Sequence, residues 1–182
     1  MSGFDNDVVT TFFPPGSVIP ADLSAWLYRE YRAAAEIAER IGDATAQADY
    51  AGRAERLRAA INARLWQADE ETYAAYDLCA GAPILRLGDP HIGATIGRYA
   101  FQTCSNLIPL YAGVADREQG RAMLRRYVLS EEHFLSPHGI RSLSRASEFY
   151  NNAVWGNPPR FGDHRVLTTS NWQGPVWIPL CY

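Results

Sequence analysis

Apolar residues recur at steps of three and four between about Asp22 and Ile41, which is the spacing of one face of an α-helix. The pattern predicts a long helix that uses Asp22 as its N-cap, stops at Gly42 and turns the apolar stripe inward. The residues expected to be buried are Leu23, Trp26, Leu27, Ala34, Ile37, Ala38 and Ile41. Charged residues on the other side are Arg29, Arg32, Glu36, Glu39 and Arg40.

A second amphipathic pattern begins after a very short turn. Its expected inner face consists of Tyr50, Ala54, Leu57, Ile61 and Leu65. Because the turn is short and both stripes are long, we expect the two helices to form an antiparallel hairpin.

Two irregular stretches follow this hairpin. The stretch "LWQADEETYAAYDL" is typical of a short strand pair or extended loop that turns at residues 69–71. Residues 81–98 carry four glycines and two prolines among apolar residues, which favours a long crossing loop. This stretch contains no G-x-G-x-x-G or G-K-[ST] spacing, so it does not indicate a phosphate-binding loop.

A second helical hairpin is expected within "CSNLIPLYAGVADREQGRAMLRRYVL". Its first helix should end near Gly113 or Val114, and Asp116 followed by Gln119 has the spacing of a capping box. The inner face of the next helix would carry Leu124, Tyr127 and Val128.

The remaining sequence is a connection of more than forty residues, rich in Pro, Gly, Asn and aromatic residues, followed by "GPVWIPLCY". Long loops inside a compact domain are usually functional, and Pro175 suits the first turn of a further helix. We therefore expect an all-α fold, an incomplete (α/α)6 toroid of helical hairpins with long aromatic loops and a minor strand pair. Residues 1–182 would form one partial domain, truncated at both ends.

Composition excludes several functional classes. The 17 Lys and Arg are scattered among 20 acidic residues, for a net charge of -3, which leaves no basic stripe for nucleic acid. No run of about 18 apolar residues could span a bilayer, and the N-terminus lacks the pattern of a signal peptide, which favours the cytoplasm.

The metal-ligating residue types do not indicate a metal or a cofactor. The cysteines Cys79, Cys104 and Cys181 form no C-x-x-C pair and are interpreted as small buried hydrophobic residues. None of the four histidines has a partner at the i, i+4 spacing of a helical metal site.

Three motifs carry a resemblance to a known family: "SGFDN" at residues 2–6, "GIRSLS" at 139–144 and "SNWQGPVWIP" at 170–179. In this order, with helical hairpins between them, they resemble the catalytic domain of glycoside hydrolase family 63. The similarity is to the bacterial mannosylglycerate and glucosylglycerate hydrolases and the α-glucosidases, and more distantly to trehalase.

This resemblance implies inverting hydrolysis of an α-glucoside or α-mannoside, with a carbohydrate as the partner. Asp5 matches the general acid of the family, and Asn6 would orient substrate hydroxyls beside it. The family's general base is a Glu beyond the third motif, and this sequence ends before it. We therefore expect the chain, without these missing parts of its own domain, to be inactive. From the residues alone, Asp5 also fits a capping or solvated loop carboxylate.

Other residues are candidates for binding the sugar. Trp172 and Gln173 present an indole and an amide side by side, which suits the C–H face and the hydroxyls of a sugar ring, and Asn171 adds a second amide. Arg141 is a candidate for a hydroxyl or a glycerate carboxylate, or for a loop salt bridge. Tyr150 is a candidate for lining the cleft.

Two other functions remain open from the sequence. The chain is also consistent with a carbohydrate-binding or scaffold remnant that keeps the aromatic pocket without turnover. A helical-ring isomerase or lyase would need His or Tyr bases in its cleft.

Overall fold

The computed structural model describes Val9, Phe13, residues 16–85, Tyr99, residues 101–137 and 139–147, and Tyr150. It also gives the backbone of short strands at 87–89, 94–96, 160–161, 164–165 and 177–178. Five of the expected site residues lie outside this described part, namely Asp5, Asn6, Asn171, Trp172 and Gln173.

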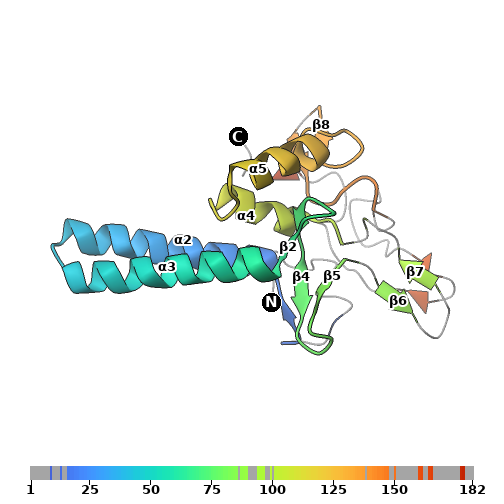
Figure 1. Ribbon diagram of the computed structural model, residues 1–182. Helices are drawn as coiled ribbons and strands as arrows, with labels where there is room; N and C mark the ends of the chain where they lie inside the picture. Colours follow the sequence, from blue (N-terminus) through green and yellow to red (C-terminus); the bar gives the residue numbers. More distant parts are fainter. Residues whose placement is uncertain are drawn as a thin grey trace.

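The first two helices, α2 (Ala21–Arg40) and α3 (Ala44–Arg64), form the predicted antiparallel hairpin. This hairpin projects from the rest of the molecule as an arm (Figure 1). At its tip Gly42 has φ 79°, and the amides of Gly42 and Asp43 donate to the carbonyls of Glu39 and Ala38. This is a Schellman ending, so the predicted stop at Gly42 is confirmed.

The start and the buried face of α2 differ from the sequence prediction. The N-cap is Pro20, without a side-chain bond, and Asp22 lies inside the first turn and is buried. The core-facing residues of α2 are Ala21, Ala25, Tyr28, Ala35 and Ala38. The predicted inner residues Leu23, Leu27, Ile37 and Ile41 are exposed. Because α2 is apolar on two sides, periodicity alone selected the larger side chains, whereas the small alanines allow the closer packing.

The predicted face of α3 is largely confirmed. Ala54, Ile61 and Leu65 are buried, while Tyr50 and Leu57 are partly buried. Asp43 caps the helix by accepting a bond from the amide of Ala46 at 2.9 Å.

Short antiparallel sheets follow α3. The expected strand pair is present as β2 (Trp66–Gln67) and β3 (Thr72–Tyr73), with Trp66 opposite Tyr73. A three-stranded sheet has the order β1-β4-β5, and a further pair is formed by β6 and β7. The bounds of these strands are β1 (Val18–Ile19), β4 (Ala75–Asp77), β5 (Ala82–Ile84), β6 (Leu87–Asp89) and β7 (Ala94–Ile96).

The predicted crossing loop at 81–98 is therefore partly wrong, because it contains three of these strands. Pro83 is tolerated since β5 is an edge strand of its sheet, where one side of the backbone needs no partner. The described fold consists of helices connected by several small sheets, with more strand than the single minor pair expected.

The second helical hairpin is confirmed, and its helices are short. It contains η1 (Cys104–Leu107), α4 (Ile108–Tyr111), α5 (Arg117–Met123) and a π-helical turn, η2 (Leu124–Val128). Asp116 and Gln119 form the expected capping box, with both bonds at 2.8 Å. On η2, Tyr127 and Val128 are buried as predicted, whereas Leu124 is exposed.

The last described sheet has the strand order β12-β9-β8, built from β8 (Leu135–Ser136), β9 (Gly139–Arg141) and β12 (Trp177–Ile178). Trp177 lies opposite Arg141 in the register. The helix expected from Pro175 is thus wrong at residues 177–178, where pairing with β9 gives a strand. Another pair is formed by β10 (Arg160–Phe161) and β11 (His164–Arg165).

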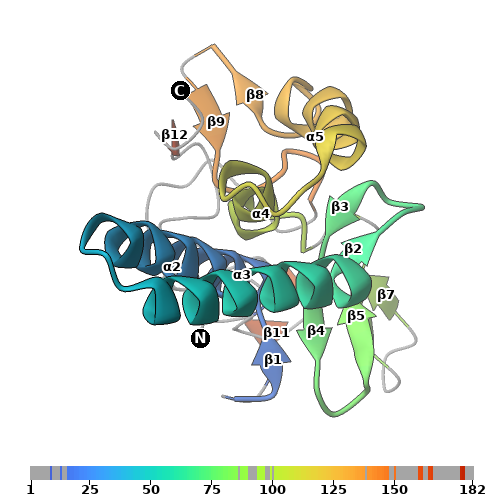
Figure 2. The ribbon, with the colours of Figure 1, turned by 60° about the vertical axis from the view of Figure 1, so that its left-hand side comes forward.

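The main core lies where the base of the arm meets the second hairpin (Figure 2). Its largest fully buried side chains include Tyr73, Tyr127, Phe134 and Met123. Cys104 is buried as expected, but Cys79 is exposed, and Cys181 lies outside the described residues. Among the described helices, none combines the length and apolar character needed to cross a membrane.

Two glycines of the arm should respond oppositely to alanine. Gly42→Ala puts a side chain at a left-handed φ of 79° and should lower the free energy of unfolding by about 1–2 kcal/mol. Gly52→Ala lies inside α3, where its Cβ meets only the flexible end of Arg56 at 3.2 Å, and should raise it by about 0.5–1 kcal/mol. Urea unfolding of both variants checks this, and a Gly42→Ala protein as stable as the native chain would contradict the assigned Schellman ending.

Candidate functional site

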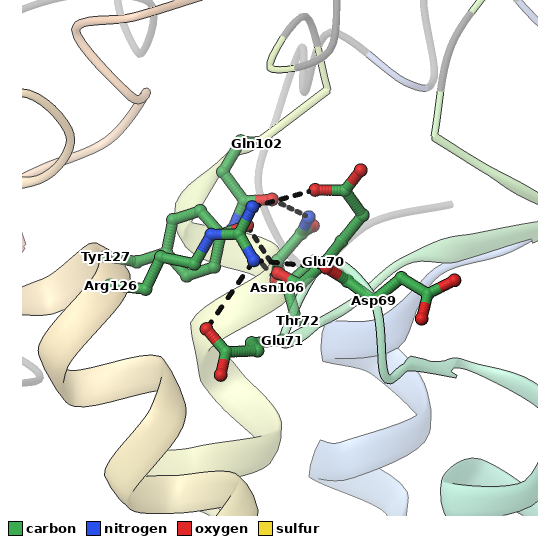
Figure 3. A network of polar contacts seen from close by, with 8 residues as sticks. All are labelled: Asp69, Glu70, Glu71, Thr72, Gln102, Asn106, Arg126 and Tyr127. Atoms are coloured by element: carbon green, nitrogen blue, oxygen red, sulfur yellow. Dashed lines mark hydrogen bonds and ion pairs between the residues drawn. The ribbon is translucent and has the colours of Figure 1, made fainter.

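A polar cluster lies where the 68–71 turn meets η2 (Figure 3). Arg126 contacts the carboxylate of Glu70 at 3.1 Å and that of Glu71 at 3.5 Å, and it donates to the carbonyl of Asp69 at 3.2 Å. The hydroxyl of Tyr127 donates to the carbonyl of Glu70 at 2.5 Å. This Glu70–Arg126 cluster connects segments that are more than fifty residues apart in the sequence.

The local backbone explains why two adjacent residues of η2 reach the same turn. A π-helical turn is wider than an α-helical one, and such turns are frequent at functional sites. From η2, Arg126 reaches the carboxylates of Glu70 and Glu71, and the hydroxyl of Tyr127 reaches the carbonyl of Glu70 (Figure 3). On the facing side Glu71 has a φ of 49°, which is uncommon for a residue other than glycine and closes the turn tightly.

Buried side-chain amides form hydrogen bonds with the residue that follows this turn. Gln102 donates from Nε2 to the hydroxyl of Thr72 at 2.9 Å. The side-chain amide of Asn106 donates to Oε1 of Gln102 at 3.3 Å and to the carbonyl of Phe101 at 3.2 Å. Thr72, Gln102 and Asn106 are all buried, so these bonds compensate for the loss of water and fix the positions of the side chains.

The surroundings of Arg126 favour its charged form. Burial acts to lower its pKa, but contacts with Tyr99, Tyr127 and Glu70 outweigh this, so the pKa is raised above its ordinary value. The guanidinium therefore stays charged between two carboxylates. Glu70 and Glu71 are its ion-pair partners, and these pairs hold the turn against η2.

His133 is buried beside this cluster. Its ring lies edge-on to Tyr99 at 4.7 Å and to Tyr127 at 4.9 Å, and Nδ1 is 2.8 Å from the hydroxyl of Ser144. Burial lowers its pKa, with Glu132 opposing and Arg126 adding to the effect. His133 is thus a neutral ring that joins the cluster to the segment containing "GIRSLS".

Arg141, a predicted binding residue, holds the preceding turn together. Its Nη1 donates to the carbonyls of Glu131 at 3.3 Å, His133 at 3.5 Å and Leu135. These bonds anchor Nη1 to the backbone of the preceding turn. The two roles expected for Arg141, a ligand contact and a loop salt bridge, stay predictions.

Tyr150, the other predicted site residue that is described, packs against a small apolar cluster. The buried members of this cluster are Val9, Ala75, Ile84, Phe101 and Leu143. Val9 comes from the N-terminal segment, Phe101 precedes η1, and Leu143 belongs to "GIRSLS". Val9 and Tyr150, which are far apart in the sequence, thus belong to or pack against the same cluster.

The "GIRSLS" segment is firmly attached to the residues before and inside η1. The amide of Cys104 donates to the carbonyl of Ser142 at 2.8 Å, and the amide of Ser144 donates to that of Gln102 at 2.9 Å. Thr103 and Leu143 form an isolated bridge between the same segments. This segment thus connects the polar cluster on one side with Tyr150 on the other.

Sequence reasoning missed the Glu70–Arg126 cluster and His133. The available signal was three consecutive acidic residues in a tight turn and a pair of arginines at 125–126, but nothing local shows that they meet. Among the described residues, no group of three or more His, Cys, Asp or Glu side chains is placed to hold a metal ion. The described part of the site is a hydrogen-bonded polar framework that could position residues lining a ligand site.

Comparison with known proteins places this chain in a family of glycoside hydrolase domains. Residues 6–182 match the family described as the mannosylglycerate hydrolase MGH1-like glycoside hydrolase domain. The chain belongs to this family.

Individual relatives agree with the family assignment. A mannosylglycerate hydrolase from Rubrobacter radiotolerans is 31% identical over 156 residues, which is 84% of this chain and 27% of that protein. The fold is similar to that of a mannosylglycerate hydrolase of glycoside hydrolase family 63 from Thermus thermophilus, solved with bound Tris. That comparison has a TM-score of 0.60 and 22% identity and covers 90% of this chain and 31% of the other.

A more distant structural neighbour is neutral trehalase from Saccharomyces cerevisiae. Its TM-score is 0.56 at 16% identity, and the match covers 72% of this chain and 22% of that protein. The chain therefore spans about a third or less of the length of these relatives.

Removing the central cation should destabilise the cluster. Arg126→Ala leaves the partly buried Glu70 carboxylate without its counter-ion and should lower the free energy of unfolding by about 2 kcal/mol. The matched control is Arg125→Ala, on the exposed neighbouring position, which should change it by less than about 0.5 kcal/mol. Equal effects in urea unfolding would contradict a specific role for Arg126.

The buried histidine should make stability depend on pH. Because the pKa of His133 is lowered in the folded chain, the unfolded chain binds the proton more readily. The contribution of neutral His133 to the free energy of unfolding is complete above the unfolded pKa of about 6.5. It is lost as the pH falls below that value, by at most about 1.4 kcal/mol per pH unit. Unfolding free energies at pH 7.5, 6.5 and 5.5 should converge for the native chain and His133→Gln on acidification. Parallel curves would exclude this role.

Proposed function

We propose that this chain is part of an inverting glycoside hydrolase that cleaves an α-glycosidic bond, with Asp5 as the general acid. The substrate class is an α-mannoside or α-glucoside, such as mannosylglycerate, glucosylglycerate or an α-glucosyl oligosaccharide. Family membership supports the hydrolase class, and the mannosylglycerate hydrolases among its relatives favour a glycerate glycoside.

The observation that carries this proposal is the small apolar cluster, to which Val9 and Leu143 both belong and against which Tyr150 packs. A chain spans at most about 3.3–3.6 Å per residue, so Asp5 lies within about 14 Å of Val9. By the same reasoning, Gln173 lies within about 14 Å of Trp177, which pairs with Arg141. These two anchors favour a meeting of all three motifs around the segment at 139–150.

Each residue then has a role in the proposed site. Asp5 protonates the leaving glycosidic oxygen, while a second carboxylate activates water on the opposite face of the sugar, roughly 6.5–9.5 Å away. Trp172 stacks on the sugar ring, and Asn6, Asn171 and Gln173 bind hydroxyls. Arg141 and Tyr150 line the wall, and Nη1 of Arg141 is held by backbone carbonyls of the preceding turn.

The second carboxylate is proposed to come from outside these 182 residues, in an (α/α)6 toroid of which this chain forms a part. Glu70 and Glu71, two of the acidic residues of the 68–71 turn, are ion-pair partners of Arg126. We therefore expect the chain by itself to show no steady turnover of α-glycosides. Because the chain covers only 27% of its Rubrobacter relative, binding of carbohydrate without turnover is the second candidate function.

A chimera tests both candidates. This chain replaces the matched 156 residues of the Rubrobacter radiotolerans enzyme, and hydrolysis of mannosylglycerate is measured. We expect turnover with initial release of the β-anomer, detected by NMR, and a fall in kcat of about 100- to 10,000-fold for Asp5→Asn. The matched control, Asp7→Asn, should keep the activity.

Several outcomes would contradict the proposal. Initial release of the α-anomer would exclude inversion, and full activity of Asp5→Asn would exclude its role as the acid. Turnover by the isolated chain that is lost in Asp5→Asn would show that no outside base is needed. Saturable binding of mannosylglycerate to the isolated chain, with an inactive but folded chimera, would favour the binding function.

A further inference from the structure

Helix α2 carries a second apolar face, directed away from the core. Its members, which we call the outer stripe, are Leu23, Leu27, Ala34, Ile37 and Ile41. The four large side chains are 48%, 43%, 60% and 73% exposed, in chain order. At 1.5 Å per residue the outer stripe runs for about 27 Å along the arm. The arm that carries this face projects from the rest of the described structure (Figure 1).

The spacing of the outer stripe indicates which kind of partner element can pack on it. Together with Glu30 its members form a seam at positions 23, 27, 30, 34, 37 and 41, separated by alternating steps of four and three residues. This is the period of 3.5 residues that a helix presents to a second helix packed nearly parallel to it, at about 20°. Single exposed leucines are ordinary on protein surfaces, but six successive seam positions with only one charge are not.

The one charged position in this seam is Glu30, next to the small Ala34. If two copies of the chain paired through the outer stripe, the seam would enclose two carboxylates and no cation. A parallel pair would bring them face to face, and an antiparallel pair would place each beside the other copy's Ala34. Burial of like charges without a counter-ion is unfavourable. A helix with Lys or Arg at the level of Glu30 avoids this cost.

The relatives provide a source for such a helix. The family match covers nearly the whole chain, yet the matched parts cover only 27–31% of the two mannosylglycerate hydrolases compared. We infer that the outer stripe of α2 is the seat of an α-helix from outside these 182 residues, apolar on one face and carrying a basic residue that meets Glu30. This inference is independent of the proposed chemistry at Asp5.

The test uses the full chain and two synthetic helical peptides. Both peptides have 21 residues with leucine and isoleucine at seam positions. The central seam residue is lysine in the first peptide and glutamate in the second. Binding is followed by fluorescence anisotropy at pH 7, and sedimentation velocity reports the oligomeric state of the chain alone. We expect the lysine peptide to bind saturably and at least about tenfold more tightly than the glutamate peptide.

Three variants locate the contact and keep the test falsifiable. Ile37→Glu should weaken binding of the lysine peptide at least about tenfold, and Glu30→Lys should reverse the preference between the peptides. Leu129→Glu is the matched control, because Leu129 is 61% exposed but lies after η2, away from the arm, and it should leave binding unchanged. All three positions are exposed, so thermal melting of each variant should match the native chain.

The alternatives give distinct results. Saturable dimerisation of the native chain at micromolar concentration, abolished by Ile37→Glu, would assign the outer stripe to a second copy and overturn the inference. Equal binding of both peptides, or equal loss in Leu129→Glu, would reduce the outer stripe to a nonspecific apolar surface. Absence of any saturable binding to the folded chain would also overturn it.

Discussion

The contact of Arg126 and Tyr127 with the 68–71 turn is the interaction on which the rest of the described structure depends. It joins the strand pair at the base of the arm to the second helical hairpin, across more than fifty residues of sequence. Tyr127 also packs on His133, whose neighbours hold the segment at 139–147. A shift of this turn would therefore move both the core and the segment that contains Arg141.

The polar character of this centre fits a positioning role. A core built only of apolar groups could be equally stable. It would fix the orientations of its side chains less strictly than the hydrogen bonds of Gln102, Asn106 and His133 do. These bonds run from the turn through η1 to the backbone of "GIRSLS". A sugar hydroxyl is recognised by the direction of its hydrogen bonds, so a site for carbohydrate benefits from such a rigid framework.

The sequence predicted the features that depend on a few neighbouring residues. The Schellman ending at Gly42 and the capping box of Asp116 and Gln119 need only local backbone geometry, and both are confirmed. Features that depend on distant partners were missed. Strand β12 replaces an expected helix because residues 177–178 pair with β9, and the Glu70–Arg126 contact has no local signal. The proposed roles of Asp5, Trp172 and Gln173 remain predictions.

The error at α2 is the most informative, because its physical cause concerns the whole domain. Periodicity found an apolar stripe but assigned it to the core of this chain, whereas the core uses the alanine face. A helix that is apolar on opposite sides is suited to a place between two layers. Leu27 and Ile37 belong to the face that we infer receives another helix. That helix and the proposed second carboxylate have one physical basis, because in both proposals a group from outside these residues completes a surface of this chain.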